Sequence, residues 1–380
     1  MTEPLPDPTD PVALTAALVR CPSVTPEEGG AIRLLQRLLE GLGFACRRAD
    51  RGGIANLIAT RGQGGPVLGF NGHTDVVPVG DGWSVEPFAG TVRDGRLWGR
   101  GAADMKSGVA AFVSACARRP ADAPGTLMVL ITGDEEGEGV DGTAAILDAM
   151  DAAGERMDGC LVGEPTCPET MGEMIKIGRR GSLTAWFEAV GRMGHAAYPH
   201  RAANPLPPLV GLLDGLARWE LDEGTAHFDP STLAIVGVDT GNAATNVIPE
   251  RARAAINLRF NDAHTGASLT EALERRAAEA SRGGVEIGVR VKVSGEPFVT
   301  EPGPLVEAVA GAVEARTGRR PALSTSGGTS DARFIRRHCP VVEVGLVGAT
   351  MHQADENVRV EDIETLALIY ADVIERALNA

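Results

Sequence analysis

The chain has few aromatic residues and lacks the long apolar runs that mark membrane proteins. Aromatic side chains make up 4% of its 380 residues, although hydrophobic residues as a whole make up 43%, an ordinary share for a globular protein. No apolar run approaches the roughly 18 residues of a membrane span, and the first residues show neither the basic nor the apolar region of a signal peptide. We therefore expect a soluble protein that is not exported and has no membrane partner.

The chain also lacks runs of basic residues and closely spaced cysteines. Its net charge of −15 and its pI near 5.0 repel phosphate backbones, so we expect no nucleic-acid partner. The six cysteines are widely spaced and form no CxxC pair, which is typical of free thiols in a reducing compartment. A cytoplasmic location is the resulting expectation. An anionic substrate would need local arginines to offset the acidic background.

Short apolar segments alternate with helical patterns along most of the chain. Strands are predicted at 66–71, 126–132, 159–162 and 340–345. Helices are predicted at 12–19, 26–41, 106–118, 143–153, 304–317 and 360–378. This alternation is typical of an α/β domain in which helices flank a mainly parallel sheet.

The pattern changes between about 181 and 293, where the order becomes β-α-β-β-α-β. The predicted elements are the strands 182–190, 232–238, 252–260 and 285–293 and the helices 205–220 and 268–282. That order is the signature of a split, ferredoxin-like α+β module. A chain of 380 residues also exceeds the usual size of a single core. We predict a catalytic domain formed by 1–180 and 294–380, with an inserted module at 181–293.

Side chains that can bind metals follow the ends of the predicted strands. His73 and Asp75 follow the first strand, and Glu135 and Glu136 follow the second. Open α/β sheets bind ligands at the carboxyl ends of their strands. Either pair alone would most often be an ordinary solvated turn. Three further residues make a two-metal hydrolase site the better interpretation: Asp104, Glu164 and His352.

The residue types suggest a role for each member of this group. Asp104 precedes a predicted helix, and by itself it would be an N-cap. Two ions about 3.5–4 Å apart need a ligand between them, however, and a carboxylate with two oxygens can bridge them. The expected ligands are His73 and Glu164 at one ion and Glu136 and His352 at the other, with Asp104 shared. Nitrogen and oxygen donors without thiolate suit Zn²⁺, with Co²⁺ or Mn²⁺ as substitutes.

Two acids of the group remain outside this ligand set. Asp75 lies two residues after His73, on the same side of an extended chain, and is suited to orient that imidazole. Glu135 is left without a metal to bind. A carboxylate beside a water molecule that a metal ion has made more acidic is suited to act as a general base. We therefore predict catalytic roles for Asp75 and Glu135.

Four segments carry these residues together with their neighbours: Asn71-Gly-His73-Thr-Asp75, Gly99-Arg-Gly-Ala-Ala-Asp104-Met-Lys, Asp134-Glu-Glu136-Gly and Gly163-Glu164-Pro-Thr. Together they resemble the motif series of the dinuclear zinc amidohydrolases, a family that includes aminoacylases, acetylornithine deacetylases and glutamate-type carboxypeptidases. The resemblance spans nearly the whole chain and fills every metal and base position. It implies two Zn²⁺ ions per subunit and hydrolysis of an amide bond.

Five further segments narrow the resemblance to one branch of that family: Lys176-Ile-Gly-Arg179-Arg180-Gly-Ser182-Leu, Gly194-His195-Ala-Ala-Tyr198-Pro-His200, Ala244-Thr-Asn246-Val-Ile-Pro249, Ser326-Gly-Gly-Thr-Ser-Asp331-Ala-Arg-Phe334 and Met351-His352-Gln-Ala-Asp-Glu356. This branch hydrolyses N-succinyl-LL-2,6-diaminopimelate to succinate and LL-2,6-diaminopimelate, in the synthesis of lysine and cell-wall precursors. The chain departs from the branch pattern at Ala332, where glycine is common, and at Met351, where isoleucine is usual. Neither departure removes a functional group.

The small anionic substrate that this branch implies carries three carboxylates. The planar guanidinium of arginine binds a carboxylate through two hydrogen bonds, although each arginine taken alone is as easily explained by a surface ion pair. Glycines would let the backbone approach the substrate closely. The expected substrate-binding residues are Arg179, Arg180, Tyr198, Asn246, Arg259, Ser326, Gly327, Gly328 and Thr329.

The resemblance also implies a homodimer formed through the inserted module, in which His195 donates to the oxyanion in the partner's site. One alternative function is acetylornithine deacetylase or another N-acyl amino-acid hydrolase of the same family, which needs fewer carboxylate-binding groups. A non-enzymatic scaffold is a second alternative. A scaffold without activity should have lost metal ligands or the general base, and the sequence keeps all of these residues.

Overall fold

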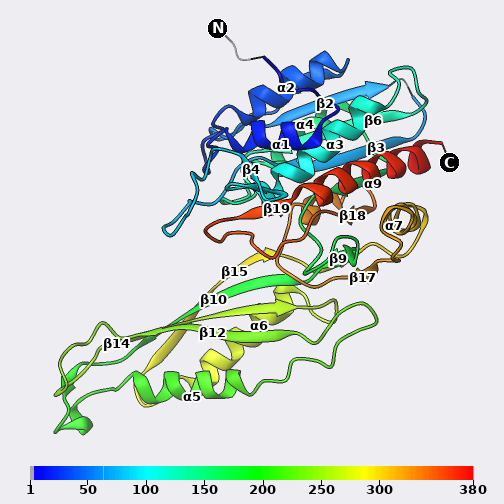
Figure 1. The fold of residues 1–380 in the computed structure, drawn as a ribbon. Coiled ribbons are helices and arrows are strands. Elements are labelled where there is room, and N and C mark those ends of the chain that lie inside the picture. The colour runs from blue at the N-terminus through cyan, green and yellow to red at the C-terminus, as the bar shows by residue number, and fades with distance from the viewer. Residues whose placement is uncertain (1–3, 63, 380) are drawn as a thin grey trace. The chain divides into compact units, whose positions relative to one another are not determined.

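The computed structural model describes residues 4–62 and 64–379, and these residues form two compact units (Figure 1). Unit 1 consists of Met1–Gly178, Thr300–Ser324 and Ser330–Ala380. Unit 2 consists of Arg179–Val299 and Thr325–Thr329. Unit 2 therefore begins at 179 and first ends at 299, where the sequence predicts 181 and 293, and it also includes 325–329, which the sequence assigns to the catalytic domain. Among the described residues, no helix is long and apolar enough to cross a membrane.

Unit 1 contains an eight-stranded sheet in the order β1-β2-β6-β3-β7-β18-β8-β17. Its strands are β1 (Ala45–Arg48), β2 (Leu57–Gly62), β3 (Val67–His73), β6 (Thr126–Thr132), β7 (Gly159–Val162), β8 (Met174–Lys176), β17 (Ala322–Ser324) and β18 (Val341–Glu343). The pairs β6·β3, β3·β7, β7·β18 and β8·β17 are parallel, and the pairs β1·β2, β2·β6 and β8·β18 are antiparallel. The predicted mainly parallel sheet is confirmed.

The helices of unit 1 pack through apolar side chains against this sheet or against one another. They are α1 (Pro11–Val19), α2 (Ala31–Gly41), α3 (Ser107–Arg118), α4 (Thr143–Ala153), α7 (Pro304–Thr317), α8 (Ala332–Ile335) and α9 (Val360–Leu378). Three rings join β3 to α3 and α9: Phe70 stacks on Phe112 with centroids 4.2 Å apart, and Tyr370 meets both edge-on. The helix predicted at 26–41 begins only at Ala31, because Gly29 and Gly30 have positive φ angles that a helix does not accommodate.

A small three-stranded sheet in unit 1 joins segments that are far apart in the sequence. It contains β4 (Thr91–Arg93), β5 (Arg96–Trp98) and β19 (Asn357–Arg359) in the order β19-β5-β4. Asn357 pairs with Trp98, and the Gly99 amide donates to the Glu356 carbonyl at 2.9 Å. The segment that follows His352 is thereby joined to the segment that leads into Asp104.

Unit 2 is an antiparallel sheet in the order β12-β14-β10-β15 with two helices. Its main elements are β10 (Gly181–Val190), α5 (Leu206–Ala217), β12 (Thr232–Asp239), β14 (Arg251–Phe260), α6 (Gly266–Ala280) and β15 (Glu286–Gly295). The remaining elements are β9 (Gly178–Arg179), β11 (Gly194–His195), the 3-10 turn Pro199–Arg201, β13 (Val247–Ile248) and β16 (Phe298–Val299). Alternate residues of β10 and β14 are buried in a core shared with both helices. The predicted β-α-β-β-α-β order is confirmed.

Candidate metal centre

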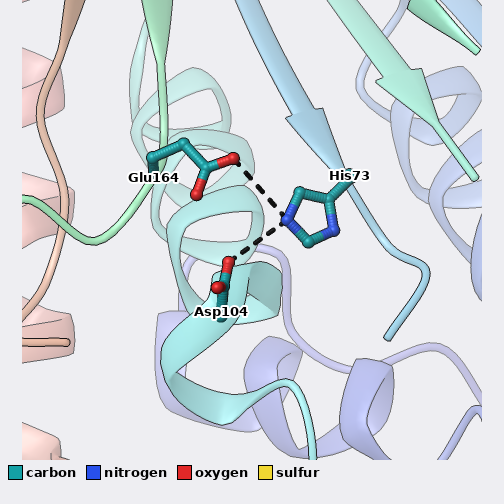
Figure 2. Close-up of side chains that lie close together, drawn as sticks. All are labelled: His73, Asp104 and Glu164. Atoms are coloured by element: carbon teal, nitrogen blue, oxygen red, sulfur yellow. Dashed lines mark hydrogen bonds and ion pairs between the residues drawn. The ribbon is translucent and has the colours of Figure 1, made fainter. Parts of the chain in front are cut away.

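A first cluster of candidate ligands lies at the ends of two adjacent parallel strands. His73 ends β3, and Glu164 follows β7 by two residues. The Nε2 atom of His73 lies 3.2 Å from Oδ1 of Asp104 and 3.7 Å from Oε1 of Glu164, as Figure 2 shows. All three residues are buried. Their ligand atoms lie within 4.8 Å of one another, close enough to hold one ion.

A second cluster uses the other oxygen of Asp104. The Nε2 atom of His352 lies 3.3 Å from Oδ2 of Asp104 and 2.8 Å from Oε1 of Glu136. The side chain of His352 is 47% exposed. Asp104 thus presents one oxygen to each imidazole, as a bridging carboxylate does. A third grouping of His73, Glu135 and Glu136 also lies within 4.8 Å, so Glu135 is near the same centre.

The backbone at Asp104 differs from the sequence prediction. Asp104 is not an N-cap, because α3 begins at Ser107 with Lys106 at its N-cap. Asp104 belongs to a tight turn, Ala102–Lys106, and its φ and ψ angles of −125° and 101° are not helical. The turn carries the carboxylate between the two imidazoles instead of into the first turn of the helix.

Asp75 connects the loop after β3 with the loop after β6. Its carboxylate accepts from Thr25 Oγ1 at 2.8 Å and from the amides of Glu136 and Glu135 at 3.0 and 3.3 Å. Its carbonyl oxygen lies 3.0 Å from Nδ1 of His73. Because a carbonyl can only accept, this contact places a proton on Nδ1 and leaves Nε2 as the ligand atom.

Burial and mutual repulsion perturb the carboxyl groups of the centre. Burial is the main reason that the pKa of Glu135 is raised to about 8, and the charge of nearby Asp331 adds to this effect. Burial also raises the pKa of Glu164 well above its usual value, with a contribution from Asp104. A divalent cation bound nearby would stabilise the charged form of both carboxyl groups, because its positive charge offsets their burial and mutual repulsion.

The pKa values of the two imidazoles are also shifted. Burial alone would lower the pKa of His73, but the hydrogen bond with Asp104 and the charge of Glu164 raise it well above its usual value. Hydrogen bonds with Asp104 and Glu136 raise the pKa of His352 to about 10. A cation that binds here would have to displace protons from these imidazoles. A set of nitrogen and oxygen donors in this arrangement fits Zn²⁺, Co²⁺ or Mn²⁺.

Unit 2 brings several of the predicted substrate-binding residues together. Arg179 Nη1 donates to the Gly328 carbonyl at 3.0 Å, which ties the 325–329 segment to β9. Burial and the neighbouring charge of Arg180 lower the pKa of Arg259. The Nε atom of Arg180 is buried without a hydrogen-bond partner among the described residues. Two guanidinium groups in a half-buried setting favour an anion beside them.

The other predicted residues of unit 2 form a separate group around His195. The Ala196 amide donates to the Asn246 carbonyl at 2.9 Å, and the Tyr198 ring meets the His195 ring edge-on at 5.7 Å. The Ala197 amide donates to Nδ1 of His195 at 3.0 Å. In the neutral ring the proton is therefore on Nε2, and exposed His195 offers a donor.

Several residues that support the centre were missed by sequence reasoning. Thr25 binds Asp75, buried Asp331 accepts from Thr143 Oγ1 at 2.7 Å, and buried Glu356 contacts the backbone at Asp104. Asp331 and Glu356 lie inside motifs that also contain predicted residues, and their position there is the signal that could have marked them. Thr25 has no comparable signal.

The family model for Peptidase family M20/M25/M40 matches residues 69–376. The chain belongs to this family of metallo-hydrolases. The solved structures it resembles include a metallo-carboxypeptidase of the M20 family from Sulfolobus solfataricus, with a TM-score of 0.78 and 17% identity over 100% of both chains. They also include the aminopeptidase PepT from Bacillus cereus, with a TM-score of 0.79 and 22% identity over 98% of this chain and 100% of that chain. At such identities these likenesses show the fold alone.

Closer relatives narrow the family to one group. The chain is 63% identical to the succinyl-diaminopimelate desuccinylase of Cereibacter sphaeroides over 97% of this chain and 99% of that protein. It is 59% identical to the enzyme of the same name from Ruegeria pomeroyi over 96% of this chain and 98% of that protein. Within the M20/M25/M40 family, the chain therefore belongs with the succinyl-diaminopimelate desuccinylases.

Proposed function

We propose that the protein hydrolyses N-succinyl-LL-2,6-diaminopimelate to succinate and LL-2,6-diaminopimelate, a step in the synthesis of lysine and cell-wall precursors. Its similarity to desuccinylases over nearly the whole chain supports this substrate. The observation that supports the chemistry is the geometry of Asp104, which presents one carboxylate oxygen to each of two imidazoles.

We also propose a cytoplasmic location. All six cysteines, each within the described part of the chain, are free thiols, which supports this location.

The proposed cofactor is a pair of Zn²⁺ ions per subunit, for which Co²⁺ or Mn²⁺ can substitute. The ligands would be His73 and Glu164 at one ion and Glu136 and His352 at the other, with Asp104 shared. When bound, such a pair supplies Lewis acidity toward the amide carbonyl and toward water. The chain's own contribution is to hold five ligands in place before the metal arrives, through β3, β7 and the loops beside them.

Glu135 is the proposed catalytic acid and base. The Asp75 carboxylate accepts from the Glu135 and Glu136 amides, so the peptide units of both residues are fixed at the centre. Glu135 would take a proton from the attacking water and return it to the leaving amine. Asp75 positions both this loop and the ring of His73.

Specificity for the succinyl group would come from the arginines of unit 2. A half-buried pair such as Arg180 and Arg259 is stabilised by a substrate carboxylate and is left uncompensated when that carboxylate is missing. Asn246, Tyr198 and the 326–329 segment would add hydrogen bonds.

The test of this function is a comparison of substrates with the zinc-loaded protein. We expect kcat/KM for succinyl-diaminopimelate to exceed that for acetyl-diaminopimelate, acetylornithine and a simple acyl amino acid by about 10³-fold or more. The variant Arg259→Met should lower the efficiency on the succinyl substrate and leave that on the acetyl substrate nearly unchanged. Equal efficiency on succinyl and acetyl substrates would favour the acetylornithine deacetylase alternative.

For His195 we propose a role in the neighbouring active site of a homodimer formed through unit 2. The exposed Nε2 donor of His195 is suited to an oxyanion. Co-refolding an inactive Glu135→Gln chain with an inactive His195→Ala chain tests this role. Heterodimers would then contain one intact site, and about a quarter of wild-type activity should return under random pairing. Proven subunit exchange without recovered activity would contradict the role.

A further inference from the structure

Arg100 and Glu356 form a buried ion pair that the proposed mechanism does not use. Arg100 Nη1 lies 2.7 Å from Glu356 Oε2, and the two side chains are 2% and 1% exposed. Burying two opposite charges costs desolvation energy that their attraction does not reliably offset. The other contacts of the pair indicate what it does for the fold.

The Glu356 carboxylate holds the backbone that leads into Asp104. Its Oε1 accepts from the amides of Ala103 at 2.8 Å and Asp104 at 3.2 Å. Its Oε2 accepts from the Gly101 amide at 3.1 Å as well as from Arg100. These contacts satisfy amides of the tight turn that precedes α3, and they fix the peptide from which the shared carboxylate projects.

The Arg100 guanidinium reaches the segment next to His352. Its Nη1 also donates to the Gln353 carbonyl at 3.2 Å, and its Nη2 donates to the Val79 carbonyl at 3.1 Å. The ring of Trp83 lies under the guanidinium at 5.1 Å. One buried group therefore binds the chain directly after His352 and the segment that leaves β3.

The two clusters depend on these contacts to different degrees. In the first cluster, His73 ends β3 and Glu164 lies two residues beyond β7, and only Asp104 depends on Glu356. In the second cluster, both Asp104 and His352 lie on segments that the pair holds. His352 also has a positive φ angle of 63° and a 47% exposed side chain, so little besides its neighbours fixes it.

We propose that Arg100 and Glu356 are positioning residues that set the affinity of the second cluster for its ion by holding Asp104 and the His352 loop at a fixed separation. This inference rests on the proposed function, because it assumes that both clusters bind metal. The pair contributes no ligand atom. It acts through Asp104 and His352.

Metal titration of the metal-free protein tests the proposal, with a chelator that competes for each ion. Glu356→Gln keeps the size of the side chain and removes its charge. We expect it to lower the affinity for one of the two ions by about 10- to 100-fold, the range typical of residues that orient metal ligands. The affinity for the other ion should stay within about threefold of wild type. Glu356→Asp keeps the carboxylate and should recover part of the loss.

The control is the ion pair of Arg119 and Glu375, remote from both clusters, in which Arg119 is 5% exposed and donates to carbonyls of Ala123 and Pro124 and Glu375 is 53% exposed. Glu375→Gln should leave both affinities unchanged. Thermal unfolding is measured for every variant. If Glu356→Gln does not fold, Arg100→Lys is titrated in its place and should show the same selective loss.

Each outcome has a definite meaning. A wild-type protein that fails to bind two ions contradicts the proposed metal centre and not the pair specifically. Two ions in the wild type with unchanged affinities in the folded variants overturn the positioning role. An equal loss at both sites that follows the loss of thermal stability also overturns it, because it shows a merely structural pair.

Discussion

The two clusters that share Asp104 differ in what holds their remaining ligands. In the first cluster, His73 is the last residue of β3 and Glu164 lies two residues beyond the adjacent parallel strand β7, and their side chains are 1% and 10% exposed. In the second, Glu136 lies in the loop after β6 and His352 in a loop before β19, with side chains 9% and 47% exposed. Strands fix a backbone more firmly than loops do.

Under the proposed ligand assignment, the sheet would organise one metal position before metal binds and loop contacts would organise the other. The Glu136 amide donates to the Asp75 carboxylate. Arg100, which pairs with Glu356, donates to the Gln353 carbonyl next to His352. We therefore expect the first cluster to bind its ion more tightly.

Removing the shared ligand should disable both clusters. Asp104→Asn keeps the shape of the side chain but replaces one charged oxygen with an amide nitrogen that cannot bind a cation. We expect less than one ion per chain by elemental analysis and a loss of turnover of at least about 10³-fold. The control Asp94→Asn, at a side chain that is 82% exposed, should retain both ions. Two tightly bound ions in Asp104→Asn would contradict a shared carboxylate.

Removing one imidazole at a time should separate the two clusters. We expect His352→Ala to keep the tighter ion at wild-type affinity and to lose the weaker one. His73→Ala should instead lose the tighter ion, since Nε2 of His73 is the nitrogen donor of the first cluster. Calorimetric titration of both variants gives the measurement. The opposite assignment of tight and weak ions would reverse the comparison.

The sequence predicts well the strands that lead into the candidate ligands, because the signals of these strands are local. Apolar runs such as Thr126–Thr132 predict buried strands, and the polar residues that follow them are visible in the chain. Where the interaction is distant in sequence, prediction fails. Asp104 has the local features of an N-cap, but Glu356, which lies 252 residues later, binds its amide and α3 starts further on. The short strands β1, β8 and β17 carry too few residues for a periodic pattern and are also missed, and so is the longer strand β2.

Metal binding to the second cluster should depend on pH. Hydrogen bonds with Asp104 and Glu136 raise the pKa of His352 from 6.5 to about 10 in the metal-free protein. Below about 10 the protonated ring competes with the ion, so the affinity of this cluster should rise with pH and binding should release a proton. The same pKa shift stabilises the metal-free fold below pH 6.5, and this stabilisation is lost as the pH rises through about 10.

Calorimetry in buffers of different ionisation enthalpy measures the released proton directly. His352→Ala serves as the control, because it removes the titrating ring from the second cluster. A wild-type affinity that is independent of pH, with no proton released, would contradict this part of the comparison.

The smallest effect is expected at Thr25. Thr25→Val removes the hydroxyl that donates to the Asp75 carboxylate and keeps the branched shape. We expect turnover to fall by about tenfold or less and both ions to remain bound, because the Glu135 and Glu136 amides still contact Asp75. Thr365→Val, on the surface of α9, is the matched control and should behave like wild type. Loss of an ion from Thr25→Val would show that Asp75 depends on this single bond.

Glu135 is proposed to move protons while its neighbours hold the metal. The claim is open to test because Glu135 lies close enough to His73 and Glu136 to be a ligand itself. In Glu135→Gln we expect two ions per chain with wild-type affinities, together with turnover of succinyl-diaminopimelate that is lower by about 10²- to 10⁴-fold. Loss of a stoichiometric ion, or turnover near that of wild type, would contradict the account.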